Sequence, residues 1–490
     1  MPATMDLAHE MGYARNAPTT ATPARRILFF FGDNRQMILQ SVNPATNRVE
    51  NTFPCWSLQT TATVLDDMSE AWSRWAVFPM RERVDMLCEA AREIRARLEP
   101  LAVLITHEMG KPLREARLEV EKCAMICEHY AAHGPQYLAP MRPHGAPQDA
   151  TVVFEPQGVV LAVMPWNFPF WQVFRIAAPT LLAGNGVALK HAPNVPGCAE
   201  VIEHIFLSAG LPENVFRSLF IDEDVVEPVL SHPGVAGVSL TGSCGAGSSV
   251  AAAAGRYLKK SVLELGGSDP FIVLPDAELD KAVPTAVASR CRNAGQACIA
   301  AKRFILHRDI YDEFLERLIF AMEDVRVGDP LRPDTDMGPL ASVYQRDRLQ
   351  NQVDRCVEAG GCILLGGSPL PGAGAFYPPT VIADVPPDAD VAGEELFGPV
   401  ALVFRAEDED EAVALANGTD FGLGGAVWTA DTKRGLALAA RIRAGSVCVN
   451  GLVRSDPFLP FGGTRSSGYG REMAEYGLRE FVNIKCVRTG

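Results

Sequence analysis

Residues 158–255 contain three short apolar runs that alternate with segments of helical pattern. The runs are Gly158-Val159-Val160-Leu161-Ala162-Val163, Gly186-Val187-Ala188-Leu189-Lys190 and Ala236-Gly237-Val238-Ser239-Leu240. Helices are expected near residues 199–209 and, in an alanine-rich segment, near residues 248–255. Short buried strands that alternate with helices form βαβ units with a mainly parallel sheet. This stretch therefore predicts an α/β domain.

A second alternating stretch runs from residue 271 to about residue 450, with strand candidates at 271–274, 400–404 and 446–450. Upstream, apolar residues recur at helical spacing over residues 68–98 and 113–129, and residues 151–154 are expected to form a strand. A chain of 490 residues is too long for one ordinary core. We therefore expect two α/β domains that meet near residues 264–267.

The composition excludes several classes of partner. The net charge of −14 provides no basic field for nucleic acid, and it would repel a carboxylate substrate unless local arginines bind it. No apolar run approaches the roughly 20 residues that span a bilayer. The twelve cysteines are scattered without a CxxC pair or zinc-ligand spacing, which predicts no metal site and a reducing, cytoplasmic location.

The first forty residues carry Ala, Thr and Pro with no clear helical period, and a short apolar run at residues 27–31. Asp6, Glu10 and Asp33 are unusual in a transit peptide, and the apolar run is too short for a secretory core. We expect residues 1–40 to be a disordered extension, with Met37 as an alternative start.

One cysteine has surroundings suited to chemistry. Cys298 ends the run Asn293-Ala294-Gly295-Gln296-Ala297-Cys298, and Glu264 lies in Leu263-Glu264-Leu265-Gly266-Gly267. A thiol flanked by small residues can be reached by a substrate, and a carboxylate can activate the thiol or a water molecule. These residue types point to covalent catalysis by a thiol.

A glycine-rich turn is the candidate nucleotide site. Thr241-Gly242-Ser243-Cys244-Gly245-Ala246-Gly247 follows a predicted strand and opens a helix, and Lys190 ends the preceding strand. Backbone amides in such a turn can approach a pyrophosphate at a helix N-terminus. The run is not GxGxxG, and by itself it is equally typical of a plain turn.

Together with Met164-Pro165-Trp166-Asn167-Phe168-Pro169, these runs resemble the aldehyde dehydrogenase superfamily. The resemblance implies the aldehyde dehydrogenase fold, with two Rossmann-like open parallel-sheet domains and a small β oligomerisation flap. It also implies that Cys298 is the nucleophile, that the Asn167 amide helps to form the oxyanion hole, and that Glu264 is the general base.

The resemblance implies a nicotinamide cofactor as well. It assigns cofactor binding to six residues, which are Trp166, Lys190, Gly242, Ser243, Glu395 and Phe397. Many NAD-specific relatives carry a glutamate three residues after the lysine, where this chain has Pro193. NADP is therefore permitted, and the choice between NAD and NADP stays open.

The resemblance extends to the branch of succinate-semialdehyde dehydrogenases. Arg175, Arg292 and Ser455 match positions where that branch binds the distal carboxylate of its substrate. The alternative for the two arginines is ordinary ion pairing on helix surfaces. The branch has members with a redox-active cysteine two residues after the nucleophile, but this chain has Ala300 there, so no such disulfide switch is expected.

The expected activity is NAD(P)-dependent oxidation of succinate semialdehyde, a small-molecule aldehyde, to succinate. Alternatives are another short or ω-carboxylated aldehyde such as glutarate semialdehyde, a catalytically silent family member, and a cysteine hydrolase without a cofactor. No histidine accompanies Cys298 in a triad-like pattern, which disfavours the hydrolase.

The resemblance also predicts how the chain is divided. Residues 41–138 and 159–266 would form the dinucleotide-binding domain, and residues 267–455 the catalytic domain. Residues 139–158 and 470–490 would be oligomerisation segments, including a hairpin from about Tyr137 to Phe154 and a last strand near residues 481–485. Because exposed strand edges of this kind usually find a partner, we expect a homodimer or a homotetramer.

Overall fold

The computed structural model describes residues 37–489 of the chain. Up to position 36, the predicted disordered extension lies outside the described residues. For residues 38–40 that prediction is wrong, because they belong to strand β1 (Ile38–Asn43), which pairs antiparallel with β2 (Arg48–Pro54). The side chain of Leu39 is buried, which explains why the strand begins this early.

The first large sheet has six strands in the order β16-β8-β7-β4-β5-β6. They are β4 (Val159–Met164), β5 (Gly186–His191), β6 (Phe216–Ser218), β7 (Val235–Thr241), β8 (Lys260–Glu264) and β16 (Gly468–Tyr469). All neighbours are parallel except β16, which pairs antiparallel with β8. The parallel sheet predicted from residues 158–255 is confirmed.

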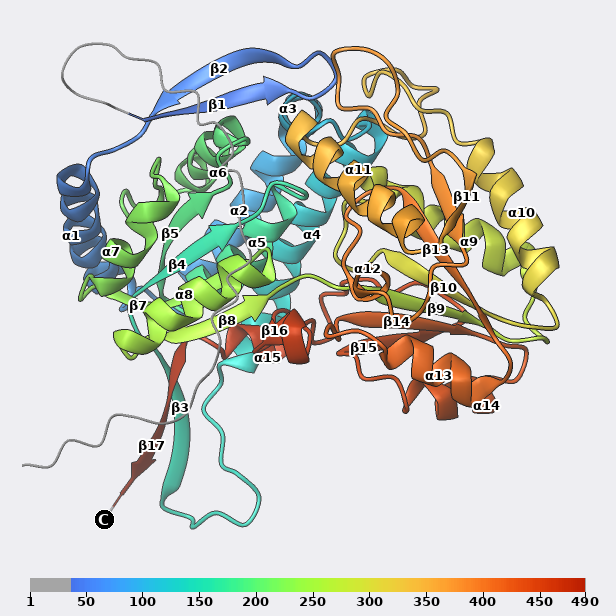
Figure 1. The fold of residues 1–490 in the computed structure, drawn as a ribbon. Coiled ribbons are helices and arrows are strands. Elements are labelled where there is room, and N and C mark those ends of the chain that lie inside the picture. The colour runs from blue at the N-terminus through green and yellow to red at the C-terminus, as the bar shows by residue number, and fades with distance from the viewer. Residues whose placement is uncertain (1–36, 490) are drawn as a thin grey trace, which may run out of the picture. The chain divides into compact units, whose positions relative to one another are not determined.

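Helices cover both faces of this sheet (Figure 1). One layer contains α1 (Leu58–Trp75), α7 (Val226–Ser231) and α8 (Cys244–Arg256). The other contains α2 (Met80–Ala96), α3 (Leu98–Met109), α4 (Leu113–Tyr137), α5 (Trp171–Leu182) and α6 (Pro196–Ser208). Successive side chains of β4 enter different cores: Val159 packs with the first layer and Val160 with the second. Burial on both faces accounts for the continuous apolar runs in the sequence.

The second large sheet has seven strands in the order β11-β12-β13-β10-β9-β14-β15. They are β9 (Asp269–Val273), β10 (Ala301–His307), β11 (Cys362–Leu365), β12 (Thr380–Ala383), β13 (Val400–Ala406), β14 (Gly424–Trp428) and β15 (Ser446–Val449). Only β11 runs antiparallel to its neighbour. Its helices are α9 (Leu279–Cys291), α10 (Tyr311–Glu323), α11 (Val343–Glu358), α12 (Asp390–Gly393), α13 (Glu409–Asn417) and α14 (Thr432–Ala439).

A small antiparallel ribbon lies apart from the two large sheets (Figure 1). It pairs β3 (Ala150–Pro156) with β17 (Val482–Arg488), so the predicted last strand is present. The predicted hairpin over residues 137–154 is wrong in its pairing. Residues 137–149 contribute only the isolated bridge from Met141 to Val152, and the extended partner of β3 is β17. Pro140, Pro143 and Pro147 lie in the intervening loop, and because proline has no amide hydrogen to donate to a strand ladder, this loop is a poor strand partner.

The helical pattern over residues 68–98 is interrupted in the structure. It covers parts of α1 and α2, which are separated at residues 76–79. Pro79 precedes the first residue of α2, where the absence of its amide hydrogen is tolerated because helix N-termini leave such donors unpaired. The second predicted helix begins at Leu113 as expected, but α4 continues to Tyr137.

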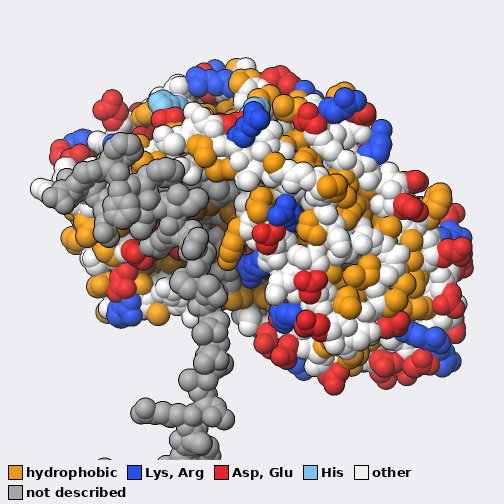
Figure 2. Space-filling view, turned by 45° about the horizontal axis from the view of Figure 1, so that its top comes forward, with side chains coloured by type: hydrophobic (Ala, Val, Ile, Leu, Met, Phe, Trp, Pro, Cys, Tyr) orange, Lys and Arg blue, Asp and Glu red, His pale blue; other side chains and the backbone are white. Residues whose placement is uncertain are grey.

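Acidic and basic side chains are interspersed on the face shown in Figure 2. None of the helices within residues 37–489 has the length and apolar character that a membrane span requires. The remaining short elements are the 3-10 helices η1 (Glu223–Val225), η2 (Arg292–Gly295) and η3 (Arg465–Ser467), and the helix α15 (Ala474–Leu478).

Candidate active site

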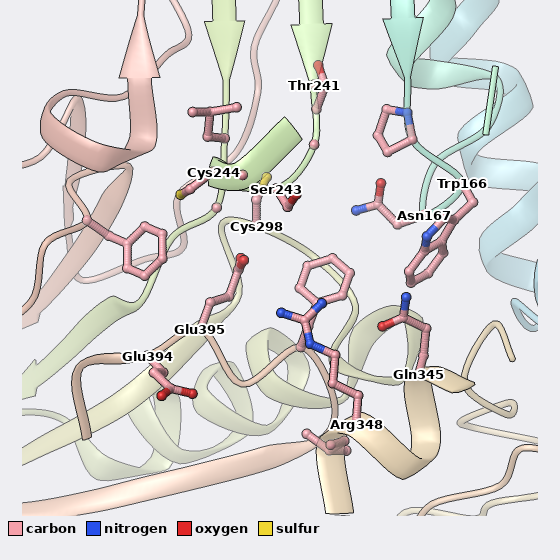
Figure 3. A pocket seen from close by; sticks show the side chains of 18 of the residues that line it. Trp166, Asn167, Thr241, Ser243, Cys244, Cys298, Gln345, Arg348, Glu394 and Glu395 are labelled. Carbon is pink, nitrogen blue, oxygen red and sulfur yellow. The ribbon is translucent and has the colours of Figure 1, made fainter. Parts of the chain in front are cut away.

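The candidate site lies where strands of the first sheet end. The carboxyl ends of β4 and β7 lead directly into Trp166-Asn167 and Gly242-Ser243, and both segments line one cavity of about 520 Å³. Figure 3 shows the strand ends that carry these residues directed at the cavity. Ligands of open α/β sheets bind at this edge. Cys298, Glu395 and Phe397, which come from the part of the chain that forms the second sheet, line the same cavity.

Cys298 is half-buried in this cavity. Burial raises the pKa of its thiol to about 12, although the nearby charges of Arg175 and Lys302 act in the opposite direction. The ammonium of Lys302 donates to the carbonyl oxygen of Cys298 at 2.8 Å and to that of Ala297 at 3.0 Å. Burial thus favours the protonated form of the thiol, and the buried Lys302 side chain holds the backbone that carries it.

A left-handed turn precedes the cysteine. Asn293, Ala294 and Gly295 have φ angles of 53°, 51° and 73°. The left-handed conformation costs roughly 1–2 kcal/mol for each residue other than glycine. The turn is fixed because the Asn293 amide nitrogen donates to Glu115 Oε2 at 2.9 Å, and its side-chain Nδ2 donates to the carbonyl oxygen of Asn167 at 2.8 Å. The cysteine loop and the Asn167 segment are thus joined directly.

The Asn167 side chain is buried beside this turn. Its Nδ2 donates one hydrogen to the carbonyl oxygen of Gln296 at 3.1 Å. A side-chain amide carries two such hydrogens, so the second is available to a bound oxygen. Figure 3 shows the Asn167 amide and Cys298 on the same cavity.

Glu264 ends β8 and is buried. Burial and, after it, the negative charge of Glu472 raise the pKa of the Glu264 carboxyl well above its usual range. Neither carboxyl oxygen has a hydrogen-bond partner within residues 37–489. Glu264 is absent from the cavity lining, whereas the next two residues, Leu265 and Gly266, belong to it. In this structure the Glu264 carboxyl therefore does not line the cavity that contains Cys298.

Arg175, in α5, is paired within the protein. Its Nε contacts Glu472 Oε2 in an ion pair whose two side chains are both buried, and one of its terminal nitrogens donates to Thr241 Oγ1 at 3.3 Å. Glu472 also accepts from the hydroxyl of Ser239 at 3.1 Å. Binding of a substrate carboxylate by Arg175 stays a prediction, since its charge is already balanced by Glu472.

Arg292 and Ser455 lie in a different environment. Arg292 is exposed, with its guanidinium carbon 5.8 Å from the centre of the Phe168 ring. Ser455 Oγ accepts a hydrogen bond from Lys122 Nζ at 2.5 Å. The pKa of the Lys122 ammonium is lowered to about 7, first by burial and then by the positive charges of Arg292 and Arg175. The structure thus places Lys122, for which the sequence predicted no role, beside Ser455, a residue predicted to bind the substrate.

Five of the six residues predicted to bind the cofactor line the cavity. Ser243 caps α8, and its hydroxyl accepts from the Ala246 amide at 3.3 Å. The rings of Trp166 and Phe397 meet edge to face at 5.7 Å. Together with Gly242 and Glu395, these residues line the cavity.

Glu395 fits closely against a glycine. Its Oε1 accepts from the Gly267 amide at 3.0 Å, and a Cβ on Gly266 would lie 2.3 Å from its Oε2. Lys190, the remaining predicted residue, is the second-last residue of β5, lies outside the cavity lining and donates to the carbonyl oxygen of His191 at 3.2 Å. Burial lowers the pKa of the Lys190 ammonium, and Glu223 and Asp222 act against that shift.

Several lining residues carry no sequence signal. Gln345 and Arg348 of α11 reach into the cavity from the second half of the chain (Figure 3). Outside the lining, Lys122 belongs to no motif and the sequence assigned no role to Glu472, because each gains its role from contacts with residues far away in the sequence. Within residues 37–489, His, Cys, Asp and Glu side chains form no group of three or more that could hold a metal ion.

The chain is similar to known aldehyde dehydrogenases in sequence. The model of the aldehyde dehydrogenase family matches residues 31–487. An NAD(P)+ succinate semialdehyde dehydrogenase of Escherichia coli strain K12 is 44% identical over 447 residues, which cover 91% of this chain and 97% of that protein. A probable NADP+ succinate-semialdehyde dehydrogenase of Synechocystis sp. is 45% identical over 451 residues, covering 92% of this chain and 99% of that protein.

The chain is also similar in fold to a solved structure. Succinic semialdehyde dehydrogenase from Streptococcus pyogenes, in complex with NADP+, has a TM-score of 0.90 and 36% identity, and the match covers 92% of this chain and 99% of that one. Two parallel sheets, a small antiparallel ribbon and a cavity that holds Cys298 and Asn167 accompany these similarities. The chain belongs to the aldehyde dehydrogenase family.

Proposed function

We propose that the chain is an NAD(P)+-dependent succinate-semialdehyde dehydrogenase. The observation that carries this proposal is one cavity in which a thiol, a side-chain amide and the N-terminus of α8 converge. The names of relatives that are 44% and 45% identical over nearly their whole length support the same activity.

The residues present suit a dinucleotide. The amides at the start of α8 are the donors that a phosphate group prefers, and the Trp166 and Phe397 rings, set edge to face, offer apolar contacts for a nicotinamide. The Glu395 carboxylate, placed against Gly266 and Gly267, would accept hydrogen bonds from ribose hydroxyls. Lys190 would reach the adenosine side from the end of β5.

In this proposal Cys298 is the nucleophile. Its thiol loses a proton, its sulfur bonds to the aldehyde carbon, and negative charge develops on the former carbonyl oxygen. The second amide hydrogen of Asn167 donates to that oxygen, and removal of one such donor typically lowers a rate by about 10²- to 10³-fold. When bound, NAD(P)+ supplies the acceptor for the hydride that leaves the same carbon. The acyl group is then held on Cys298 as a thioester.

Hydrolysis of the thioester needs a base for the attacking water. We assign this role to Glu264, the buried carboxyl at the end of β8. A carboxylate with a raised pKa is a stronger base once it is ionised. Both of its oxygens lack hydrogen-bond partners in the described residues, and the side chain would have to turn toward Cys298 to accept a proton from the attacking water.

The distal carboxylate of the substrate needs positive charge, because the chain as a whole is acidic. Arg292 is exposed near Phe168, which directly follows Asn167, so it lies close to the reacting segment. Ser455 could donate its hydroxyl hydrogen to the same carboxylate. We retain Arg175 as a third candidate, which would need to exchange part of its contact with Glu472 for the substrate.

A substrate panel tests the proposed function. Initial rates of NADH or NADPH formation are measured with aldehydes of two to six carbons, with and without a terminal carboxylate, and glutarate semialdehyde is included as the rival substrate. We expect the highest kcat/KM with succinate semialdehyde. The variant Cys298→Ser should be inactive, and Cys362→Ser, at an exposed thiol of β11, serves as the matched control. No preference for carboxylated aldehydes would overturn the substrate assignment.

We further propose the division of the chain and its assembly as expected from the sequence. Residues 41–138 and 159–266 bind the dinucleotide, residues 267–455 carry the catalytic thiol, and residues 139–158 and 470–490 mediate a homodimer or homotetramer. Exposed Ile484 and Val487 on β17 support an interface there. All twelve cysteines are free thiols, as expected for a protein of the reducing cytoplasm.

A further inference from the structure

We propose that Lys122 is a specificity-determining residue that binds the distal carboxylate of the substrate together with Arg292. This inference rests on the proposed function, since it concerns the same aldehyde. Lys122 is on α4, and its Nζ lies 2.5 Å from Ser455 Oγ and 3.9 Å from the centre of the Trp171 ring. Its ammonium is therefore held in one place by a hydroxyl and an aromatic face.

The two cations border the segment that carries the oxyanion donor. Phe168 and Trp171 follow Asn167 closely at the start of α5, and Arg292 lies by the first ring while Lys122 lies by the second. Arg292 is also part of the turn that leads to Cys298. A carboxylate that reached both cations would thus be attached to an aldehyde whose other end lies near the thiol.

Nearby carboxylates do not neutralise Lys122. Glu119 pairs with Lys111, and its other oxygen accepts from the amide of Phe170 at 2.9 Å. Glu472 pairs with Arg175. A partly buried ammonium without an anionic partner is unfavourable in the free protein, so its presence favours a role in binding an anion.

The inference predicts how binding depends on pH. Burial, and after it the positive charges of Arg292 in η2 and Arg175 in α5, lower the pKa of the free ammonium to about 7, while Cys123 and Glu119 of α4 act in the opposite direction. A bound carboxylate raises that pKa, because opposite charge favours the protonated form. Binding above pH 7 therefore takes up a proton. The KM for succinate semialdehyde should rise with pH above about 7, and the KM for uncharged butanal should not.

The test compares Lys122→Met, which keeps the length of the side chain without its charge, with Lys122→Arg, which keeps the charge. Lys281→Met is the matched control, since Lys281 is exposed and pairs with Glu278 on α9. For each protein, kcat and KM are measured with succinate semialdehyde and with butanal from pH 6 to pH 9, and thermal unfolding confirms that the variants fold.

We expect Lys122→Met to raise the KM for succinate semialdehyde by about 10- to 100-fold at pH 6.5, the effect of losing one charge-assisted hydrogen bond. The constants for butanal should stay within about threefold, the pH dependence of KM should disappear, and Lys122→Arg should restore most of the affinity. Equal losses with both aldehydes, or an unchanged KM, would overturn the inference. A wild-type protein with no preference for succinate semialdehyde would instead overturn the proposed function.

Discussion

At the scale of single residues, Glu264 combines two properties that conflict. It is buried with unpaired oxygens, as a strong base should be, but the same burial keeps its carboxyl protonated well above the usual pH range. The base form therefore becomes more abundant as pH rises. Hydrolysis of the thioester should accelerate with pH for as long as Glu264 is the group that loses the proton.

The variant Glu264→Gln tests this assignment. The amide cannot accept the proton from water, so the thioester should form and then hydrolyse about 10²- to 10⁴-fold more slowly. Stopped-flow absorbance should show a burst of about one NADH or NADPH per active site, followed by a slow steady rate. Loss of the burst together with the steady rate would place Glu264 before the hydride step instead.

The sequence predicts individual residues only where a motif contains them. Cys298, Asn167 and Glu264 occur in recognisable runs, but Lys122 does not, because its contact with Ser455 joins positions 333 residues apart. No role was predicted for Glu472 either, because its importance lies in its ion pair with Arg175. Long-range pairs of charged side chains are a property of the folded chain and leave no local pattern.

At the scale of elements, a carboxylate from one helix caps another. Glu119 of α4 accepts from the amide nitrogens of Phe170 and Trp171 at 2.9 and 3.1 Å, where α5 begins, and it pairs with the buried Lys111. The amides at a helix start need such acceptors because they have no partner within the helix. This contact fixes the segment that directly follows Asn167.

The substitution Glu119→Gln should destabilise the protein by about 3–5 kcal/mol, because it leaves the Lys111 ammonium buried without its counterion. The free energy of unfolding is measured by urea denaturation. The double variant Lys111→Met with Glu119→Gln removes the uncompensated charge and should recover a large part of the loss. If the double variant is less stable than Glu119→Gln alone, the ion pair is not the cause.

Strands were predictable where both faces are apolar and were missed where charged residues interrupt the run. Strand β10 contains Lys302 and Arg303, which suggest a surface segment in the sequence. Both are buried, because Lys302 donates to backbone carbonyls of the cysteine loop and Arg303 to the carbonyl oxygens of Ser268 and Ala416. Hydrogen bonds to the backbone compensate the burial of such cations, and no periodicity reveals them.

At the scale of the whole molecule, the β3–β17 ribbon exposes apolar side chains on a two-stranded sheet. A hairpin-sized sheet of this kind is marginal by itself, so a second subunit is expected to cover it. The variant Ile484→Asp should lower the mass measured by analytical ultracentrifugation, whereas Leu258→Asp, at a 94% exposed position between α8 and β8, should not. A wild-type protein that sediments as a monomer at micromolar concentration would contradict this prediction.

The two large α/β sheets could be predicted from alternating apolar runs in the sequence. The pairing of a C-terminal segment with the first sheet could not. Strand β16, Gly468–Tyr469, pairs with β8 next to Glu264, so the first sheet is completed by residues from the far end of the chain. Two residues are too few to produce a pattern. The pairing of β16 with β8 is therefore seen only in the structure.

We propose that this site oxidises an aldehyde with a distal carboxylate, and one ratio of rate constants tests this proposal. It is kcat/KM for succinate semialdehyde divided by kcat/KM for butanal, compared between the wild-type protein and Arg292→Ala. Loss of the exposed guanidinium should reduce the ratio by about 30- to 1,000-fold, equivalent to about 2–4 kcal/mol, with butanal nearly unaffected. If kcat/KM falls equally with both aldehydes, so that the ratio stays the same, Arg292 does not bind the distal carboxylate and is a structural residue.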